Sequence, residues 1–124
     1  MAQAVAQKTV KRNYSQPDET RKFEKGHIEL ITIEGHTVGR ATLQPGWKWS
    51  TCVKPLADTR WCEASHLQYQ ISGRLHVVME DGSEHEFGPG DFTFIPPGHD
   101  AWVVGQEPVV ALDMTGLKDY AKKR

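Results

Sequence analysis

The side chains best suited to chemistry lie on one face of a single predicted strand. In residues 62–71, the alternation of a β-strand gives one face a thiol, an imidazole and two amides, and gives the other face apolar groups. A polar face of this kind either points into water or lines the interior of a barrel, where it can hydrogen-bond or ligate. The polar face carries Cys62, Ala64, His66, Gln68 and Gln70, and the apolar face carries Leu67, Tyr69 and Ile71.

A second candidate for chemistry, His99, directly follows a rigid turn. Gly90 and Gly98 can adopt the positive φ angles that tight turns require. Pro96 and Pro97 end the strand between these glycines because proline has no backbone N–H to donate. A short loop braced in this way holds a functional side chain in position, although the same imidazole can simply hydrogen-bond its own turn.

Short strand-forming segments separated by glycine turns follow one another along most of the chain. With no convincing interior helix, this pattern predicts an all-β sandwich or barrel, and only residues 117–123 could add a helical turn. We expect a polar N-terminal arm at residues 1–24 that is flexible or packs at an edge, a barrel at 25–116 and a short basic tail at 117–124. The predicted strands are 27–33, 36–43, 47–53, 62–71, 75–79, 83–87, 92–95, 102–104 and 109–114.

The composition describes one domain with a modest core. The chain has 124 residues, of which 38% are hydrophobic, and its formal net charge of −1 gives no support for binding nucleic acid or an anionic membrane. We find no apolar run near the roughly 20 residues that a membrane span needs, and no secretory signal. With only two cysteines, a disulfide scaffold is not expected and the cytoplasm is the expected location.

The spacing of the turn residues resembles that of a known family. Residues 46–116 are similar to a small, single-domain bacterial cupin, which has a double-stranded β-helix, or jelly-roll, barrel. The second cupin motif has the form Gly, five residues, Pro, one residue, Gly, two residues, His. Gly90, Pro96 and Gly98 fit this spacing, whereas Ala101 stands at the histidine position and the nearest imidazole lies two residues earlier.

The first cupin motif is matched less closely. Counting forward from Gly46 places Cys52 and Lys54 at the positions of the motif's two histidines. Gly73 closes the motif. Counting back seven residues from Gly73 places His66 at the position of the motif's glutamate, and Cys62 lies four residues before His66. The turn framework therefore matches the family better than the ligand positions do.

The resemblance implies a divalent metal held inside the barrel, and in that frame the candidate ligands are Cys52, Cys62, His66 and His99. A regular strand would separate Cys62 from His66 by about 13 Å, so a bulge or a loop is needed to bring both to one metal. Thiolate and imidazole ligands are most compatible with Zn, and Fe, Mn, Ni and Cu are the other candidates. The plainer alternative is that the cysteines are small buried hydrophobic residues and that His66 is a buried, hydrogen-bonded histidine.

Three classes of function remain open within this resemblance. The first is a metal-dependent enzyme of the isomerase, lyase or oxygenase type, the second is a ligand-binding or sensor barrel without a metal, and the third is a structural domain that has lost its site. Metal content and turnover would separate these classes, and no catalytic residue is assigned. The resemblance also implies a homodimer and a small-molecule ligand, for which the candidate contacts are Gln68, Gln70, Trp49 and Trp102.

Overall fold

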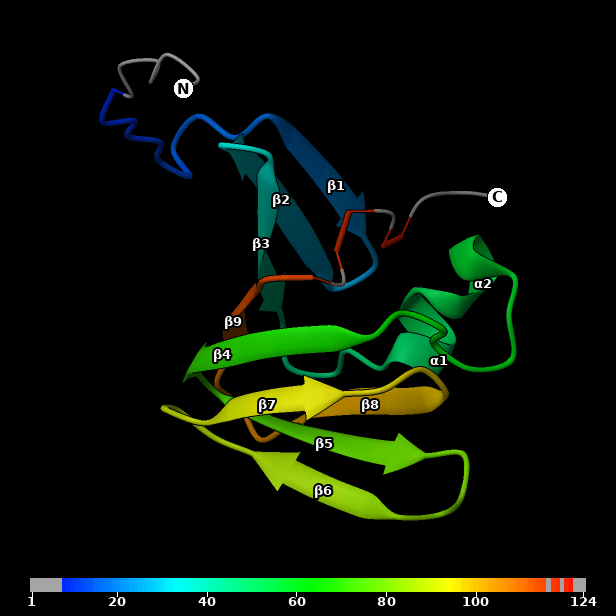
Figure 1. Ribbon diagram of the computed structural model, residues 1–124. Helices are drawn as coiled ribbons and strands as arrows, with labels where there is room; N and C mark the ends of the chain where they lie inside the picture. The colour runs from blue at the N-terminus through cyan, green and yellow to red at the C-terminus, as the bar shows by residue number, and fades with distance from the viewer. Residues whose placement is uncertain (1–7, 116, 119, 122–124) are drawn as a thin grey trace, which may run out of the picture.

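The computed structural model describes residues 8–115, 117, 118, 120 and 121, and almost all of its regular structure is β (Figure 1). Six strands form one sheet in the order β1-β2-β3-β9-β4-β7, and three form a second sheet in the order β6-β5-β8. The strands are β1 (Glu19–Phe23), β2 (Gly26–Ile33), β3 (His36–Leu43), β4 (His66–Ser72), β5 (Arg74–Met79), β6 (Glu84–Phe87), β7 (Phe92–Ile95), β8 (His99–Val104) and β9 (Val109–Asp113), and the short helices are α1 (Trp49–Cys52) and α2 (Lys54–Ala57).

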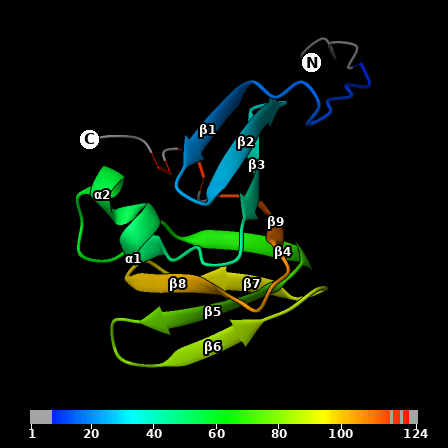
Figure 2. The same ribbon diagram turned by 180° about the vertical axis from the view of Figure 1, so that it is seen from behind.

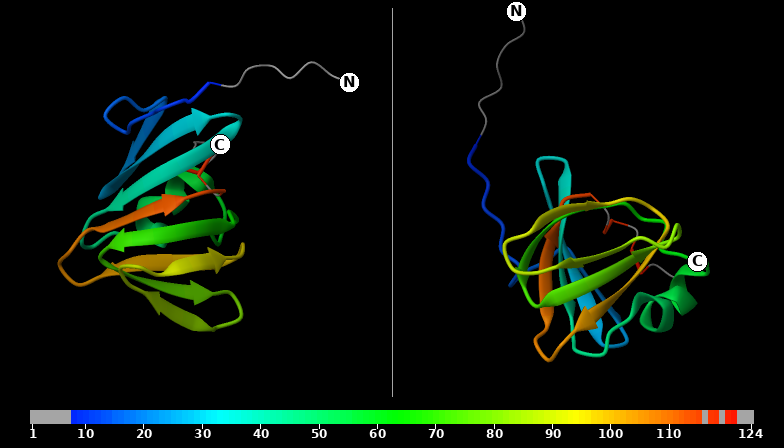
Figure 3. Two further views of the ribbon diagram at one scale, coloured as in Figure 1. Left: turned by 60° about the vertical axis from the view of Figure 1, so that its left-hand side comes forward. Right: turned by 90° about the horizontal axis from the view of Figure 1, so that it is seen from below.

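The two sheets pack around a shared interior, which confirms the predicted all-β jelly-roll barrel (Figures 2 and 3). Apolar side chains at alternate positions of the strands point inward and form the main core. Within the described residues, no helix is long and apolar enough to cross a membrane. The largest core cluster contains Leu43, Trp47, Trp49, Cys52, Val53, Cys62, Leu75, Val77, Ile95, Ala101, Val103 and Val109.

The turn between β7 and β8 has the predicted conformation. Gly98 has φ +92°, a left-handed value that a side chain with a Cβ rarely adopts, and Gly90 before β7 has φ +91°. Six of the predicted strands agree with the structure to within one residue at each end. The exception next to this turn is β8, which begins at His99 instead of residue 102 and so includes the candidate histidine.

The predicted strand at residues 47–53 is wrong, because Trp49–Cys52 forms helix α1. Trp47 and Trp49 at alternate positions are compatible with a strand, but the buried side chains of Trp49, Cys52 and Val53 follow the three- and four-residue spacing of a helix. Backbone N–H groups of Cys52 and Val53 donate to carbonyls four residues earlier, at 2.8 and 2.9 Å. This turn of helix lies at one end of the barrel (Figure 2).

The described part of the predicted N-terminal arm lies against the sheet. Glu19–Phe23 forms β1, which pairs with β2 over five residue pairs, so the sheet begins inside the segment predicted as an arm. Arg12 donates to Asp18 at 2.7 Å, and the Tyr14 hydroxyl donates to the carbonyl of Val38 at 2.8 Å. Residues 1–7 of the arm, and residues 119 and 122–124 of the predicted tail, lie outside the described residues.

Candidate metal centre

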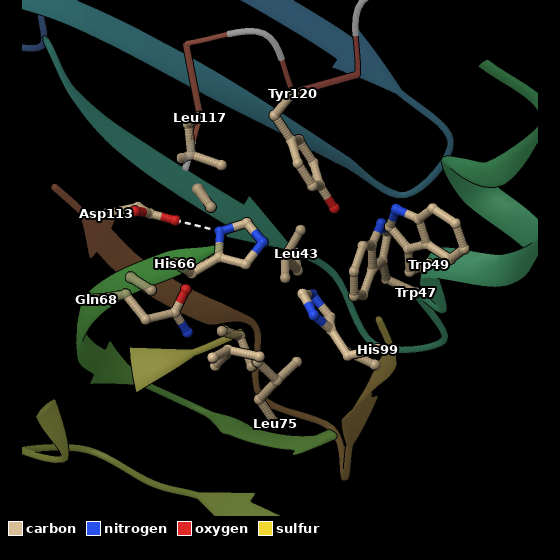
Figure 4. Close-up of a pocket in the computed structure, with 15 residues that line it drawn as sticks. Leu43, Trp47, Trp49, His66, Gln68, Leu75, His99, Asp113, Leu117 and Tyr120 are labelled. Carbon is tan, nitrogen blue, oxygen red and sulfur yellow. Dashed lines mark hydrogen bonds and ion pairs between the residues drawn. The ribbon is translucent and has the colours of Figure 1, made fainter. Parts of the chain in front are cut away.

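The inward faces of the two sheets enclose a cavity of about 50 Å³, shown in Figure 4. Most of its wall is aliphatic or aromatic, and polar groups converge at a few points. A largely apolar pocket with a few convergent polar groups is the usual form of a small-molecule site. The polar groups come from four different parts of the chain, namely His66 and Gln68 on β4, His99 on β8, Asp113 on β9 and Tyr120 in the C-terminal segment.

Beside this cavity, a thiol and two imidazoles come together. One ligand atom each from Cys62, His66 and His99 lies within 4.8 Å of the other two, and all three residues are buried. The Cys62 Sγ lies 3.8 Å from Nε2 of His66. Such a group has the composition of a metal site with borderline-soft ligands.

A break in the strand brings Cys62 to His66. The regular strand begins at His66, and Cys62 forms an isolated bridge to His99 at the start of β8. The Cys62 N–H donates to the carbonyl of His99, and the Gly98 N–H donates to the carbonyl of Cys62, both at 2.8 Å. Residues 63–65 carry no regular structure, so the separation of about 13 Å expected for a regular strand does not apply.

Both imidazoles are oriented by hydrogen bonds at Nδ1. His66 Nδ1 donates to Oδ2 of Asp113 at 2.5 Å, and the Asp113 carboxylate, only 1% exposed, also accepts from the Thr115 N–H at 3.0 Å. His99 Nδ1 donates to the carbonyl of Pro96 at 2.8 Å. These bonds leave Nε2 as the ring atom available for ligation, and partners of this kind fix the tautomer and orientation of metal-binding histidines.

The same contacts shift the ionisation of the cluster. Burial alone would raise the pKa of the Cys62 thiol, but hydrogen bonds and positive charge from His66 and His99 outweigh burial and lower that pKa to about 6. Burial alone would lower the pKa of His66, but its hydrogen bonds to Asp113 and Cys62 outweigh burial and raise it to about 9. In the metal-free protein near neutral pH, Cys62 is therefore a thiolate paired with an imidazolium.

Two hydrogen-bond donors face the cavity from the side opposite β4. The buried indole N–H of Trp47 has no hydrogen-bond partner among the described residues, although Trp47 lines the cavity. The hydroxyl of Tyr120 points toward Trp47 and Trp49 in Figure 4. Burial raises the pKa of Tyr120 well above its usual value, so its hydroxyl stays protonated and able to donate.

Tyr120 reaches the cavity because β1 and β3 hold the C-terminal segment in place. The Arg21 guanidinium on β1 donates to the carbonyls of Lys118 at 2.6 Å and of Tyr120 at 2.7 Å. On β3, Gly39 allows close packing, since a Cβ at that position would lie 2.5 Å from Cδ1 of Leu117. The predicted basic tail thus supplies part of the cavity wall.

Of the four predicted ligand contacts, two line the cavity and two do not. Gln68 and Trp49 are part of its wall. The Gln70 amide instead donates to the carbonyls of Gly73 and Phe87, at 2.7 and 3.1 Å, and so braces the barrel. Trp102 stacks on His76 with ring centroids 4.7 Å apart and lies outside the cavity wall.

The fourth predicted metal ligand, Cys52, lies apart from the cluster. It is a free cysteine in the core, 5% exposed, and its Sγ lies 3.6 Å from the Thr51 hydroxyl. Asp113 and Tyr120 were not predicted as site residues, although both line the cavity. Asp113 could have been found from the alternation along β9, because its side chain points inward with those of Val109 and Ala111. A buried acid at such a position requires a hydrogen-bond or charge partner.

Comparison with known proteins identifies the family. The family model for the EutQ-like cupin domain matches residues 47–112, which is more than half of the chain. The chain belongs to the EutQ-like cupin family. No curated protein matches the sequence. In this cupin, Ala101 at the motif's histidine position and His99 both line the cavity, so the displaced imidazole keeps the inward face of β8.

Solved structures share the cupin fold at low sequence identity. A protein of unknown function from Rhizobium leguminosarum bv. viciae 3841 is 20% identical, with a TM-score of 0.63 over 89% of this chain and 98% of that one. Oxalate decarboxylase from Lactobacillus farciminis, in a formate complex, is 21% identical with a TM-score of 0.58, covering 82% of this chain and 32% of that one. The polyketide cyclase RemF from Streptomyces resistomycificus is 16% identical with a TM-score of 0.57, covering 85% and 76%. The chain thus spans about a third of the oxalate decarboxylase.

Proposed function

We propose that this cupin binds a divalent metal ion through Cys62, His66 and His99 and uses it to hold and activate a small, oxygen-bearing molecule inside the barrel. The observation that carries the proposal is the orientation of the two imidazoles. Each has its Nδ1 hydrogen engaged by Asp113 or by the Pro96 carbonyl, which leaves Nε2 free to ligate, and a ring nitrogen of each imidazole lies within 4.8 Å of the Cys62 sulfur. A thiolate and two such imidazoles form a ligand set that suits Zn best, with Fe, Mn, Ni and Cu as the other candidates.

The number of protein ligands bears on the chemistry. A divalent ion held by these three residues would have a coordination position left for a ligand and would polarise a ligand oxygen atom there. Structural zinc sites, by contrast, are closed by four protein ligands. The remaining cysteine, Cys52, is not part of the cluster, so a metal-assisted isomerase, lyase or oxygenase reaction is favoured over a purely structural site.

The cavity indicates the class of ligand. Its volume of about 50 Å³ is room for only a few water-sized groups, since one water needs about 10–15 Å³. The unpartnered Trp47 indole N–H and the protonated Tyr120 hydroxyl both donate hydrogen bonds and would pair with acceptor oxygens. A small carboxylic acid, oxoacid or carbonyl compound fits this combination of size and donors. Gln68 on the cavity wall can donate or accept.

A cobalt titration of chelator-stripped protein tests this proposal, because Co²⁺ bound to a thiolate gives a charge-transfer band. We expect one ion per chain and this band in the parent protein. Cys62→Ser should lose the band, and His66→Ala should bind at least about 100-fold more weakly. Cys52→Ser is the matched control and should behave as the parent. Equal affinity and an unchanged spectrum in Cys62→Ser would overturn the proposed site, and a metal-free barrel for ligand binding would become the better account.

A further inference from the structure

The exposed large hydrophobic side chains of the described residues are concentrated on one face. Six such side chains are at least 36% exposed, and five of them lie on the adjacent strands β4 and β7. The most exposed are Phe94 at 65% and Phe92 at 59%. Exposed apolar groups are normal when scattered singly, but a contiguous patch marks an interaction surface. The β4–β7 face comprises Leu67, Tyr69, Ile71, Phe92 and Phe94.

The side chains of the β4–β7 face form one continuous surface. In the antiparallel pairing, Leu67 lies opposite Phe94 and Tyr69 opposite Phe92, and the rings of Tyr69 and Phe92 are 5.9 Å apart. Directly paired residues point to the same side of a sheet, so these side chains all project outward, away from the metal cluster. Ile71 extends the surface along β4.

Farther along the same sheet, on β3, the N-terminal segment of the chain covers the outward side. The pairing register carries the outward side from Tyr69 through Leu112 on β9 to Arg40 on β3. Tyr14 from the N-terminal segment lies over β3. The Arg40 guanidinium is 4.7 Å from the centroid of the Tyr14 ring, and the Tyr14 hydroxyl donates to the Val38 carbonyl. No contact of this kind covers the β4–β7 face within the described residues.

We propose that the β4–β7 face binds a second copy of this chain as a symmetric homodimer. The exposed fractions of the five side chains amount to roughly 500 Å² of apolar surface, taking about 200 Å² for each full side chain. A standard interface buries about 800 Å² on each partner, of which about 65% is apolar in homodimers, so the patch matches the apolar part of one such interface.

The chemistry of the face also favours a second copy. None of its five side chains is charged, so no oppositely charged partner is indicated. A two-fold axis requires one self-complementary patch, and a flat cluster of aromatic and aliphatic groups packs readily on its own copy.

Analytical ultracentrifugation of the full chain from about 1 to 100 µM tests this interface. We expect the parent to sediment at twice its mass of 14.0 kDa. Phe92→Gln with Phe94→Gln should weaken the dimer at least about 100-fold while the circular dichroism spectrum stays unchanged. Val10→Gln is the control, since Val10 is an apolar residue 44% exposed outside this face, and its dimer should persist.

If the double variant does not fold, Leu67→Glu places one charge on the same face and should also yield monomers. A parent that is monomeric over the whole concentration range would overturn the proposal and leave another occupant for the face. A dimer that survives both Phe92→Gln with Phe94→Gln and Leu67→Glu would place the interface elsewhere. Dissociation of the Val10→Gln variant would have the same consequence.

Discussion

The two faces of strand β4 reverse the usual division between inside and outside. Inward, His66, Gln68 and Gln70 are polar and at most 8% exposed, whereas outward, Tyr69 and its apolar neighbours on β4 are 36–47% exposed. A solvent-facing sheet ordinarily buries its apolar residues and exposes its polar ones. Both departures cost free energy in an isolated chain, because polar groups need partners when buried and apolar groups are better removed from water.

Each face of β4 therefore requires groups that cover it or pair with it. The inward groups find these partners in Asp113, in backbone carbonyls and, by our proposal, in a metal ion and a small ligand. The outward groups contact one another, as the rings of Tyr69 and Phe92 do, but they remain 36–65% exposed within the described part of one chain, which is why a second copy is proposed. The inward face should therefore respond to pH and metal, and the outward face to protein concentration.

The largest expected difference between the faces is in their response to pH. Between pH 6 and 9, Cys62 is already a thiolate while His66 still carries the proton that a metal must displace. Metal affinity should therefore rise about tenfold per pH unit, or about 1000-fold over this interval, and level off above pH 9. Below pH 6 the slope should be steeper, because the Cys62 thiol must also lose its proton.

Competition titrations with a chromophoric chelator measure this slope, and sedimentation at the same pH values provides the contrast. Because aromatic and aliphatic groups make up the outward face, dimer dissociation should stay constant between pH 6 and 9. Flat metal affinity across the interval would show that His66 gives up no proton and is not a ligand.

The next largest effect is the loss of metal affinity when His66 keeps its ring but loses the carboxylate that orients it. Asp113→Asn keeps the shape of the side chain but removes the charge that holds His66 Nδ1 at 2.5 Å. We expect metal affinity to fall by about 10–100-fold without loss of the thiolate-to-cobalt band. Asp81→Asn, in an exposed hairpin turn, is the control and should leave the affinity at the parent value. An Asp113→Asn protein with parental affinity would contradict the orienting role.

A smaller effect distinguishes two amides on the inward face. Gln70→Ala leaves the buried carbonyl of Gly73 and the partly buried carbonyl of Phe87 without their donor and should lower the free energy of unfolding by about 1–3 kcal/mol. Gln68→Ala, on the cavity wall, should cost less stability. Urea denaturation of both variants measures the difference. If the two substitutions cost the same, Gln70 does not have the bracing role assigned to it.

The smallest effect belongs to the outward face. In the monomeric Phe92→Gln, Phe94→Gln background, Tyr69→Thr should lower the free energy of unfolding by less than about 1 kcal/mol, since Tyr69 is 38% exposed and its contact with the Phe92 ring is already removed. Thermal unfolding of the two proteins provides the comparison. A larger loss would mean that Tyr69 stabilises the single chain and is not reserved for a partner.

Much of the fold was predictable because its signals are local. Glycine and proline turns set the strand boundaries, and Gly90 and Gly98 have the positive φ values that their positions required. Strand β1 was missed because Glu19–Phe23 is polar and owes its structure to pairing with β2. The helix at Trp49–Cys52 was missed because two tryptophans at alternate positions imitate a strand.

The candidate site was predictable in its residue types but not in its geometry. Cysteine and histidine on one face indicated ligation, yet the approach of Cys62 to His66 depends on where β4 begins, which pairing with His99 determines. The contact between His66 and Asp113 joins residues 47 positions apart in the chain. The position of Tyr120 likewise depends on Arg21, far away in sequence, so no local pattern could reveal either contact.

Elemental analysis of protein purified without a histidine tag or added metal tests whether Cys62, His66 and His99 hold a metal ion. We expect close to one metal ion per chain in the parent and in Cys52→Ser, and none in the Cys62→Ser, His66→Ala double variant, with all three proteins folded. Metal absent from the parent even after reconstitution, or equally present in the double variant, would contradict the assignment of Cys62, His66 and His99 as the metal centre.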